Sequence, residues 1–93
     1  MTKKVILVDE KDNVCTSVSE IKKNDQFKIV KNNTEVWAKA IEDVSFGHKI
    51  AINNILKGDS IIKYGQIIGR AKKDINKGEW VHIHNVCDTY KSI

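Results

Sequence analysis

The sequence predicts an all-β fold. Apolar residues occur in short bursts rich in β-branched side chains, and no window keeps the i, i+3, i+4, i+7 apolar period of a helix for three turns. The chain has five glycines and no proline, so its bends depend on glycine. With 93 residues, the chain is predicted to form a single domain, 1–93, with a small core.

The predicted strands follow these bursts in order along the chain: 5–8, 27–30, 49–52, 61–62, 67–68 and the alternating run 80–84. Residues 34–41 are the one stretch where a short helix competes with a strand. Residues 31–34, Lys-Asn-Asn-Thr, predict an exposed hairpin tip. All the glycines lie in the second half, which is therefore expected to be the turn-rich part.

A seven-residue motif occurs three times, at 21–27, 55–61 and 75–81. Each copy reads apolar, any residue, Lys, Gly or Asn, acid, any residue, apolar. Because glycine and asparagine tolerate positive φ, the fourth position predicts a tight turn that leads into a strand. Because the second half is turn-rich, we expect positive φ among Gly47, Gly58 and Gly78. Asn24 occupies the matching position of the first corner and should share that backbone state. The outer apolar residues should anchor each corner to the core.

Charge and targeting signals narrow the functional classes. Sixteen Lys and Arg against twelve Asp and Glu leave a net charge of +4, which favours anionic partners. Nucleic acid is disfavoured, because the lysines are scattered among acids with few aromatic residues between them. The apolar run 5–8 is too short for a signal peptide or a membrane span, so we expect no membrane partner and a cytoplasmic location. Cys15 and Cys87 lie far apart and are interpreted as packed thiols.

The densest polar signal is His82-Ile83-His84-Asn85. On a strand, residues i and i+2 share a face, so both imidazoles would project together, as in a metal site or an acid/base pair. Alternatively, both histidines simply face solvent opposite Ile83. His48 follows Phe46-Gly47 at a predicted turn into a strand, where it could face a cleft or be an exposed turn residue.

A third polar segment runs from Lys63-Tyr64-Gly65 to Gly69-Arg70. A cation and a phenol beside a glycine could hold a carboxylate or hydroxyl group, because glycine lets a ligand approach the backbone. A β-hairpin with solvated Lys63 and Arg70 explains the same pattern equally well. Lys49, next to His48, is a further cation that could pair with a carboxylate.

The order of these motifs, G-H-K at 47–49, K-G-D at 57–59, I-K-Y-G at 62–65, I-G at 68–69 and H-x-H-N at 82–85, resembles the SAF-type domain of altronate and galactarate dehydratases. The similarity extends over nearly the whole chain, and it is closest in kind to the small chain of split members such as sulfolactate sulfo-lyase. The H-x-H-N ending is more similar to altronate and sulfolactate members than to galactarate ones. The resemblance implies a β-clip fold, a long bent β-hairpin wrapped on itself.

The resemblance also implies lyase chemistry: elimination of water from an anionic sugar acid of the altronate type, by a small subunit that is inactive without a large dehydratase subunit. Such an elimination needs a base, an acid and a stabiliser of the enediolate. The catalytic candidates are His48, His82 and His84, and His82 and His84 are also candidate ligands of a divalent metal, Fe²⁺ by resemblance. The predicted substrate-binding residues are Lys49, Lys63, Tyr64, Arg70 and Asn85.

A competing interpretation has the same fold but no catalytic activity, since a fold does not fix a function. In that interpretation the chain is a non-catalytic SAF module that binds an anionic sugar or docks a partner protein. A small basic nucleic-acid binder is a third interpretation, which steep salt-dependent binding to generic DNA or RNA would support.

Overall fold

The computed structural model describes residues 3–31 and 34–87, and every regular element in them is a β-strand. This confirms the all-β prediction. The strands are β1 (Lys3–Ile6), β2 (Val14–Thr16), β3 (Gln26–Lys31), β4 (Thr34–Lys39), β5 (Lys49–Ala51), β6 (Ser60–Lys63), β7 (Gln66–Ala71), β8 (Trp80–Val81) and β9 (Val86–Cys87). Within these residues there is no helix of the length and apolarity needed to cross a bilayer.

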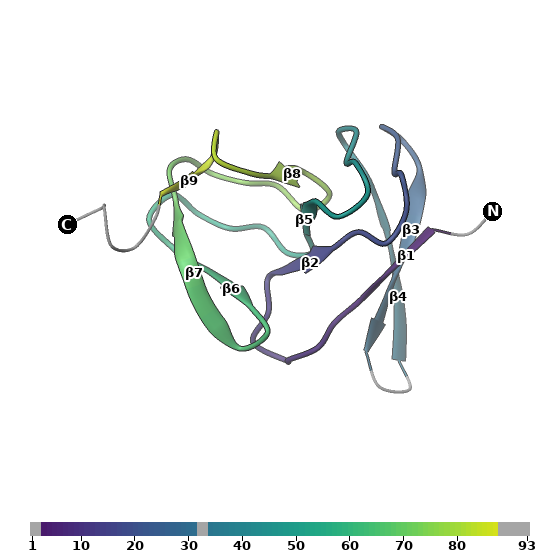
Figure 1. The fold of residues 1–93 in the computed structure, drawn as a ribbon, viewed down its shortest axis with the longest axis horizontal. Coiled ribbons are helices and arrows are strands. Elements are labelled where there is room, and N and C mark those ends of the chain that lie inside the picture. Colours follow the sequence, from purple (N-terminus) through teal and green to yellow (C-terminus); the bar gives the residue numbers. More distant parts are fainter. Residues whose placement is uncertain (1–2, 32–33, 88–93) are drawn as a thin grey trace.

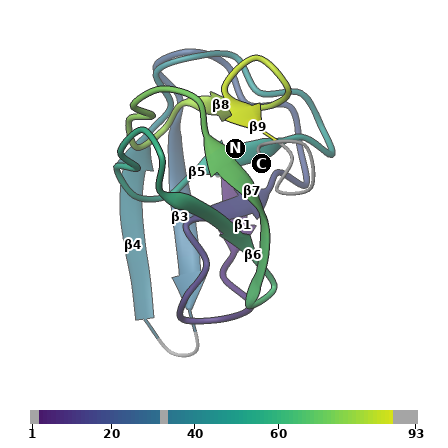
Figure 2. The same ribbon diagram turned by 90° about the vertical axis from the view of Figure 1, so that its left-hand side faces the viewer.

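The strands form three small sheets, each of three strands: β1-β3-β4, β2-β5-β8 and β6-β7-β9. In Figure 1 the β2-β5-β8 sheet lies between the other two. β1 runs parallel to β3, whereas the other paired strands are antiparallel. Figure 2 shows the β6–β7 hairpin crossing in front of this arrangement, with β3 and β4 to one side.

Most predicted strands are present, although their bounds differ: the predicted strand 5–8 is β1, which spans Lys3–Ile6, so the prediction is wrong at Leu7 and Val8. Residues 34–41 contain strand β4, which pairs with β3 from Gln26↔Lys39 to Lys31↔Thr34, so the strand alternative is correct and the helix alternative is wrong. The tip residues Asn32 and Asn33 lie outside the described residues. The predicted strand 80–84 is wrong beyond Val81, because residues 82–85 form a turn. The short strands β2 and β9 were not predicted.

The three predicted corners are present and have the expected backbone. The φ angles of Gly58 and Gly78 are both 90°, Gly47 has 84°, and Asn24 has 76°, so the prediction of positive φ is confirmed at all four. In each corner, the acid caps its own turn: the carboxylate accepts a hydrogen bond from the N–H of the residue three positions earlier. The three bonds are Lys22 N to Asp25 Oδ2, Leu56 N to Asp59 Oδ2 and Asn76 N to Glu79 Oε1.

The structure adds a fourth corner, residues 44–50, which we call the Gly47 corner. In all four corners, one distant residue forms two backbone hydrogen bonds with the turn. Its carbonyl accepts the N–H of the corner's fourth residue, and its N–H donates to the carbonyl of the corner's fifth residue. The residues held in this way are Ala40, Ala71 and Ala51 for the Asn24, Gly58 and Gly78 corners, and Ser17 for the Gly47 corner. The sequence motif missed this corner because Phe46 replaces its lysine and His48 its acid.

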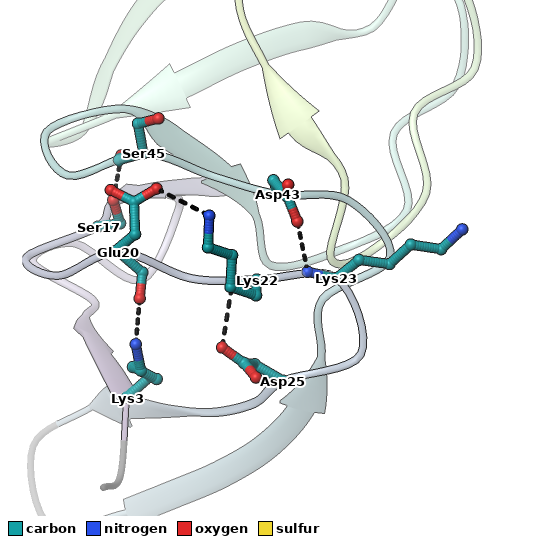
Figure 3. Close-up of polar contacts among 8 residues, drawn as sticks. All are labelled: Lys3, Ser17, Glu20, Lys22, Lys23, Asp25, Asp43 and Ser45. Atoms are coloured by element: carbon teal, nitrogen blue, oxygen red, sulfur yellow. Dashed lines mark hydrogen bonds and ion pairs between the residues drawn. The ribbon is translucent and has the colours of Figure 1, made fainter.

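The corners associate in two pairs. Ile21 bridges Val44, and Ile55 bridges Ile75, each with two backbone hydrogen bonds. Figure 3 shows the first pair: Asp43, next to Val44, accepts from the Lys23 N–H, and the Ser17 hydroxyl donates to the Ser45 carbonyl of the Gly47 corner. The outer apolar residues of all four corners are buried, as predicted.

Each pair of corners encloses one cluster of core residues, and the β2-β5-β8 sheet separates the two clusters. Because neighbouring residues on a strand face opposite sides, Cys15 and Ile50 enter the first cluster while Val14, Ala51 and Val81 enter the second. Burial raises the pKa of the Cys15 thiol to about 12. That value fits the interpretation of Cys15 as a packed, unreactive thiol.

Candidate functional site

The candidate site forms where β5 and β8 pair side by side. Their register matches Ile50 with Trp80 and Lys49 with Val81, so one further step places His48 opposite His82. The His48 and His82 rings are accordingly stacked, with centroids 5.2 Å apart and an interplanar angle of 27°. His48 and His82 therefore lie side by side, although they are distant in the sequence.

Trp80 lies at the centre of this group. Its ring stacks on His82 with centroids 5.2 Å apart and contacts His84 at 4.8 Å and His48 at 5.7 Å. The indole Nε1–H donates a hydrogen bond of 3.0 Å to Nδ1 of His48. We call these four side chains the histidine–tryptophan cluster. Sequence reasoning missed Trp80, although its position two residues before His82 was a usable signal.

His82 and His84 are held by a turn, and Asn85 closes it. The Asn85 side-chain oxygen accepts the His82 N–H at 2.9 Å, and its amide donates to the Trp80 carbonyl at 2.8 Å. Asn85 is fully buried. Asn85 was predicted to bind substrate, whereas in the structure its side-chain oxygen and amide are used inside the turn, where they hold the backbone of His82 and Trp80.

Replacing Asn85 by alanine is expected to destabilise the fold by about 2–3 kcal/mol, because the Trp80 carbonyl and His82 N–H lose their buried partner. Urea unfolding of the purified chain measures this. The matched control is Asn76→Ala, since Asn76 is exposed and forms its turn contacts with Glu79 through its backbone atoms. Equal midpoints for the two variants would contradict the assigned role of Asn85.

His48 departs from the pattern of the other corners. At its position the other three corners have an acid whose side chain closes the turn, whereas His48 contributes only its backbone N–H, which donates to the Ser45 carbonyl. Its side chain is directed to Trp80 instead. A position that departs from a local rule followed at the three equivalent positions is a candidate functional position.

The predicted substrate-binding residues Lys49, Lys63 and Tyr64 form a separate group. Lys49 pairs with Val81 and thus faces the side of the sheet opposite to Trp80. Burial, and then the charge of Lys63, lower the pKa of Lys49. Lys63 Nζ lies 4.8 Å from the centre of the Tyr64 ring. The structure therefore associates Lys49, Lys63 and Tyr64 with one another rather than with the histidines.

The Lys63–Gln66 reversal is the predicted glycine hairpin. Lys63 pairs with Gln66, and both Tyr64 and Gly65 have positive φ, 55° and 73°, the backbone of a tight two-residue turn. The buried carboxylate of Asp12 accepts the Gly65 N–H at 2.8 Å and fixes this turn. Arg70 lies exposed on β7 opposite Ser60, without a side-chain contact to either group in the described residues.

The described residues do not fit a complete metal site. Nowhere in 3–31 and 34–87 do three or more His, Cys, Asp or Glu side chains lie close enough to hold a metal ion. In the cluster, the Nδ1 lone pair of His48 is occupied by the Trp80 N–H. His82 and His84 remain predicted ligands for a metal that takes its further ligands from outside the described residues.

The family model of the altronate/galactarate dehydratase SAF domain matches residues 3–89. The chain is 39% identical over 83 residues to altronate dehydratase of Bacillus subtilis (strain 168), covering 89% of this chain and 16% of that protein.

Two further relatives are also a dehydratase and a lyase subunit. Altronate dehydratase of Escherichia coli (strain K12) is 38% identical over 80% of this chain and 14% of its own length. Subunit alpha of (2R)-sulfolactate sulfo-lyase from Paracoccus pantotrophus is 36% identical over 66% of this chain and 90% of that subunit. The chain thus spans a small part of the altronate dehydratases and nearly the whole length of the sulfo-lyase subunit, and it belongs to the altronate/galactarate dehydratase SAF-domain family.

Proposed function

We propose that this chain is the SAF subunit of a sugar-acid lyase that eliminates water from an altronate-type aldonate. In this proposal His48, His82 and His84 belong to an active site that a larger dehydratase subunit completes. The relatives support the reaction class, because two are altronate dehydratases and one is a lyase subunit.

The observation that carries the proposal is the convergence of the three histidines on Trp80. His48 is distant in sequence from the other two, and its ring lies 5.2 Å from that of His82. The side chains of Asp25, Asp59 and Glu79 close their own corners, whereas none of the three histidine side chains closes a corner. Partly exposed imidazoles gathered in this way can exchange protons with, or donate hydrogen bonds to, a bound acid.

The elimination removes the proton next to the carboxylate, passes through an enediolate and expels a hydroxide that must be protonated. This chain can supply imidazoles for proton handling and hydrogen bonding. Lys49 and Lys63 are cations without a carboxylate partner within salt-bridge distance in the described residues, and they are proposed partners for an anionic ligand. Among the described residues no group of three or more His, Cys, Asp or Glu side chains gathers at the histidines, so the remaining catalytic groups are assigned to the larger subunit.

Exposed apolar side chains beside the cluster support a covered site. Ile83, between His82 and His84, is 75% exposed, and Phe46, two residues before His48, is 69% exposed. The other three corners have lysine at the position of Phe46. Solvent-facing aromatic and branched side chains at a functional site favour a protein interface. We assign this surface to the larger subunit.

A divalent metal, predicted as Fe²⁺, would supply Lewis-acid stabilisation of the enediolate when bound. Because the described residues do not complete a metal site, most ligands of such an ion are assigned to the larger subunit. No role of the histidines proposed here depends on it.

The test is reconstitution. The tagged chain is purified from its host under anaerobic conditions, its partner and any bound metal are identified, and keto product is measured on altronate, related aldonates and sulfolactate. We expect turnover by the complex and none by the chain alone. Full turnover by the chain alone would refute the two-subunit site. An inactive complex in which the isolated chain still binds aldonate would instead favour the non-catalytic binding module.

A further inference from the structure

Trp80 constrains the protonation of His48. An indole nitrogen is a hydrogen-bond donor only, and it never accepts. The 3.0 Å bond from Trp80 Nε1 to His48 Nδ1 therefore requires an unprotonated Nδ1. In a neutral imidazole only one nitrogen carries a proton, so that proton lies on Nε2 of His48.

Trp80 is itself fixed on several sides. Its backbone N–H donates to Glu42 Oε1 at 3.0 Å, and its carbonyl accepts the Asn85 amide at 2.8 Å. Its ring is in contact with both His82 and His84. The donor that faces His48 Nδ1 is thus held by the β5–β8 pairing and by the turn that Asn85 closes, rather than being a free surface side chain.

The tautomer limits the chemistry of His48. A base or a metal ligand at Nε2 needs a lone pair there, whereas this tautomer presents an N–H. Forming the imidazolium would place a second N–H on Nδ1, directly against the Trp80 N–H, and would break their bond. A neutral imidazole N–H is a good hydrogen-bond donor to an oxygen that gains negative charge.

We propose that Trp80 is a positioning residue that holds His48 as the Nε2–H tautomer, so that His48 donates a neutral hydrogen bond to a carboxylate or enediolate oxygen of the ligand. This role of His48 rests on the proposed function, whereas the tautomer does not. Proton transfer then falls to His82, His84 or the larger subunit, because His48 keeps its proton throughout.

The first test reads the tautomer without any activity assay. In long-range ¹H–¹⁵N spectra of the histidine-labelled chain at mildly alkaline pH, His48 is expected to show an acceptor-type Nδ1 and a protonated Nε2. Trp80→Phe keeps an aromatic ring but removes the donor, and it should give a mixture of the two tautomers. Trp37→Phe is the control, since Trp37 is 52% exposed on β4 and should leave the spectrum unchanged. A wild-type chain with the proton on Nδ1 would overturn the inference.

The second test uses the reconstituted enzyme and remains informative even where Trp80→Phe fails to fold. His48→Gln retains a neutral amide donor but is neither a base nor a good metal ligand. We expect it to keep at least about tenfold more activity than His48→Ala, in line with the effect of one hydrogen-bond donor to an oxyanion. Equal loss in both variants would refute the donor role. An inactive wild-type complex whose His48 has the expected tautomer would refute the proposed function alone.

Discussion

The variant His48→Ala is expected to lower kcat of the reconstituted enzyme by a factor on the order of 10² or more, the usual effect of removing a hydrogen-bond donor or acid/base group that acts in the transition state. The fold should tolerate the change. The Gly47 corner is closed by backbone atoms: the Gly47 N–H donates to the Ser17 carbonyl, and the His48 carbonyl accepts the Ser17 N–H. His84→Ala is expected to act in the same direction.

Asp59→Ala is the matched control, because Asp59 occupies the same corner position as His48 but closes its own turn through the Leu56 N–H. It should lose about 1 kcal/mol of stability and leave kcat unchanged. The two variants thus have opposite expected outcomes in the same two measurements, urea unfolding and steady-state turnover. Unchanged turnover in His48→Ala and His84→Ala would remove the histidine–tryptophan cluster from catalysis.

Gly78→Ala is expected to lower the free energy of unfolding by about 3–5 kcal/mol, against a total of about 5–15 kcal/mol for an ordinary domain. Two causes combine. With φ of 90°, a β-carbon is strained at this position, and it would lie 2.2 Å from the Lys39 carbonyl oxygen. The contact is with backbone, which also binds here through the Ile41 N–H to the Gly78 carbonyl, so relief requires moving the main chain.

Gly58→Ala separates the two causes, since Gly58 has the same φ of 90° but nothing within 4 Å of an added β-carbon. It should cost only about 1–2 kcal/mol, the conformational part. Urea midpoints of the two variants, measured under identical conditions, give the difference. Similar midpoints would mean that the close approach to Lys39 is relieved without cost.

Several features of the fold could be predicted because they depend on local backbone requirements. The positive φ at Asn24, Gly58 and Gly78 favours asparagine or glycine whatever residues surround it, so a short sequence motif reveals it. The same motif missed the Gly47 corner, although its backbone is equivalent. There the lysine and acid that identify the other copies are replaced, and the hydrogen bonds that define the corner involve Ser17, a residue distant in sequence.

The sequence by itself determined the all-β class, three of the four corners and the histidines as candidates, because strand and turn preferences depend on residues close together in the chain. Only the tertiary structure decided which of these candidates meet. The pairing of β5 with β8 places His48 opposite His82 and beside Trp80, and the Asn85 turn brings His84 to the same ring. A pattern within one strand shows which face it buries, but its partner among distant strands depends on how those faces pack together in the whole fold.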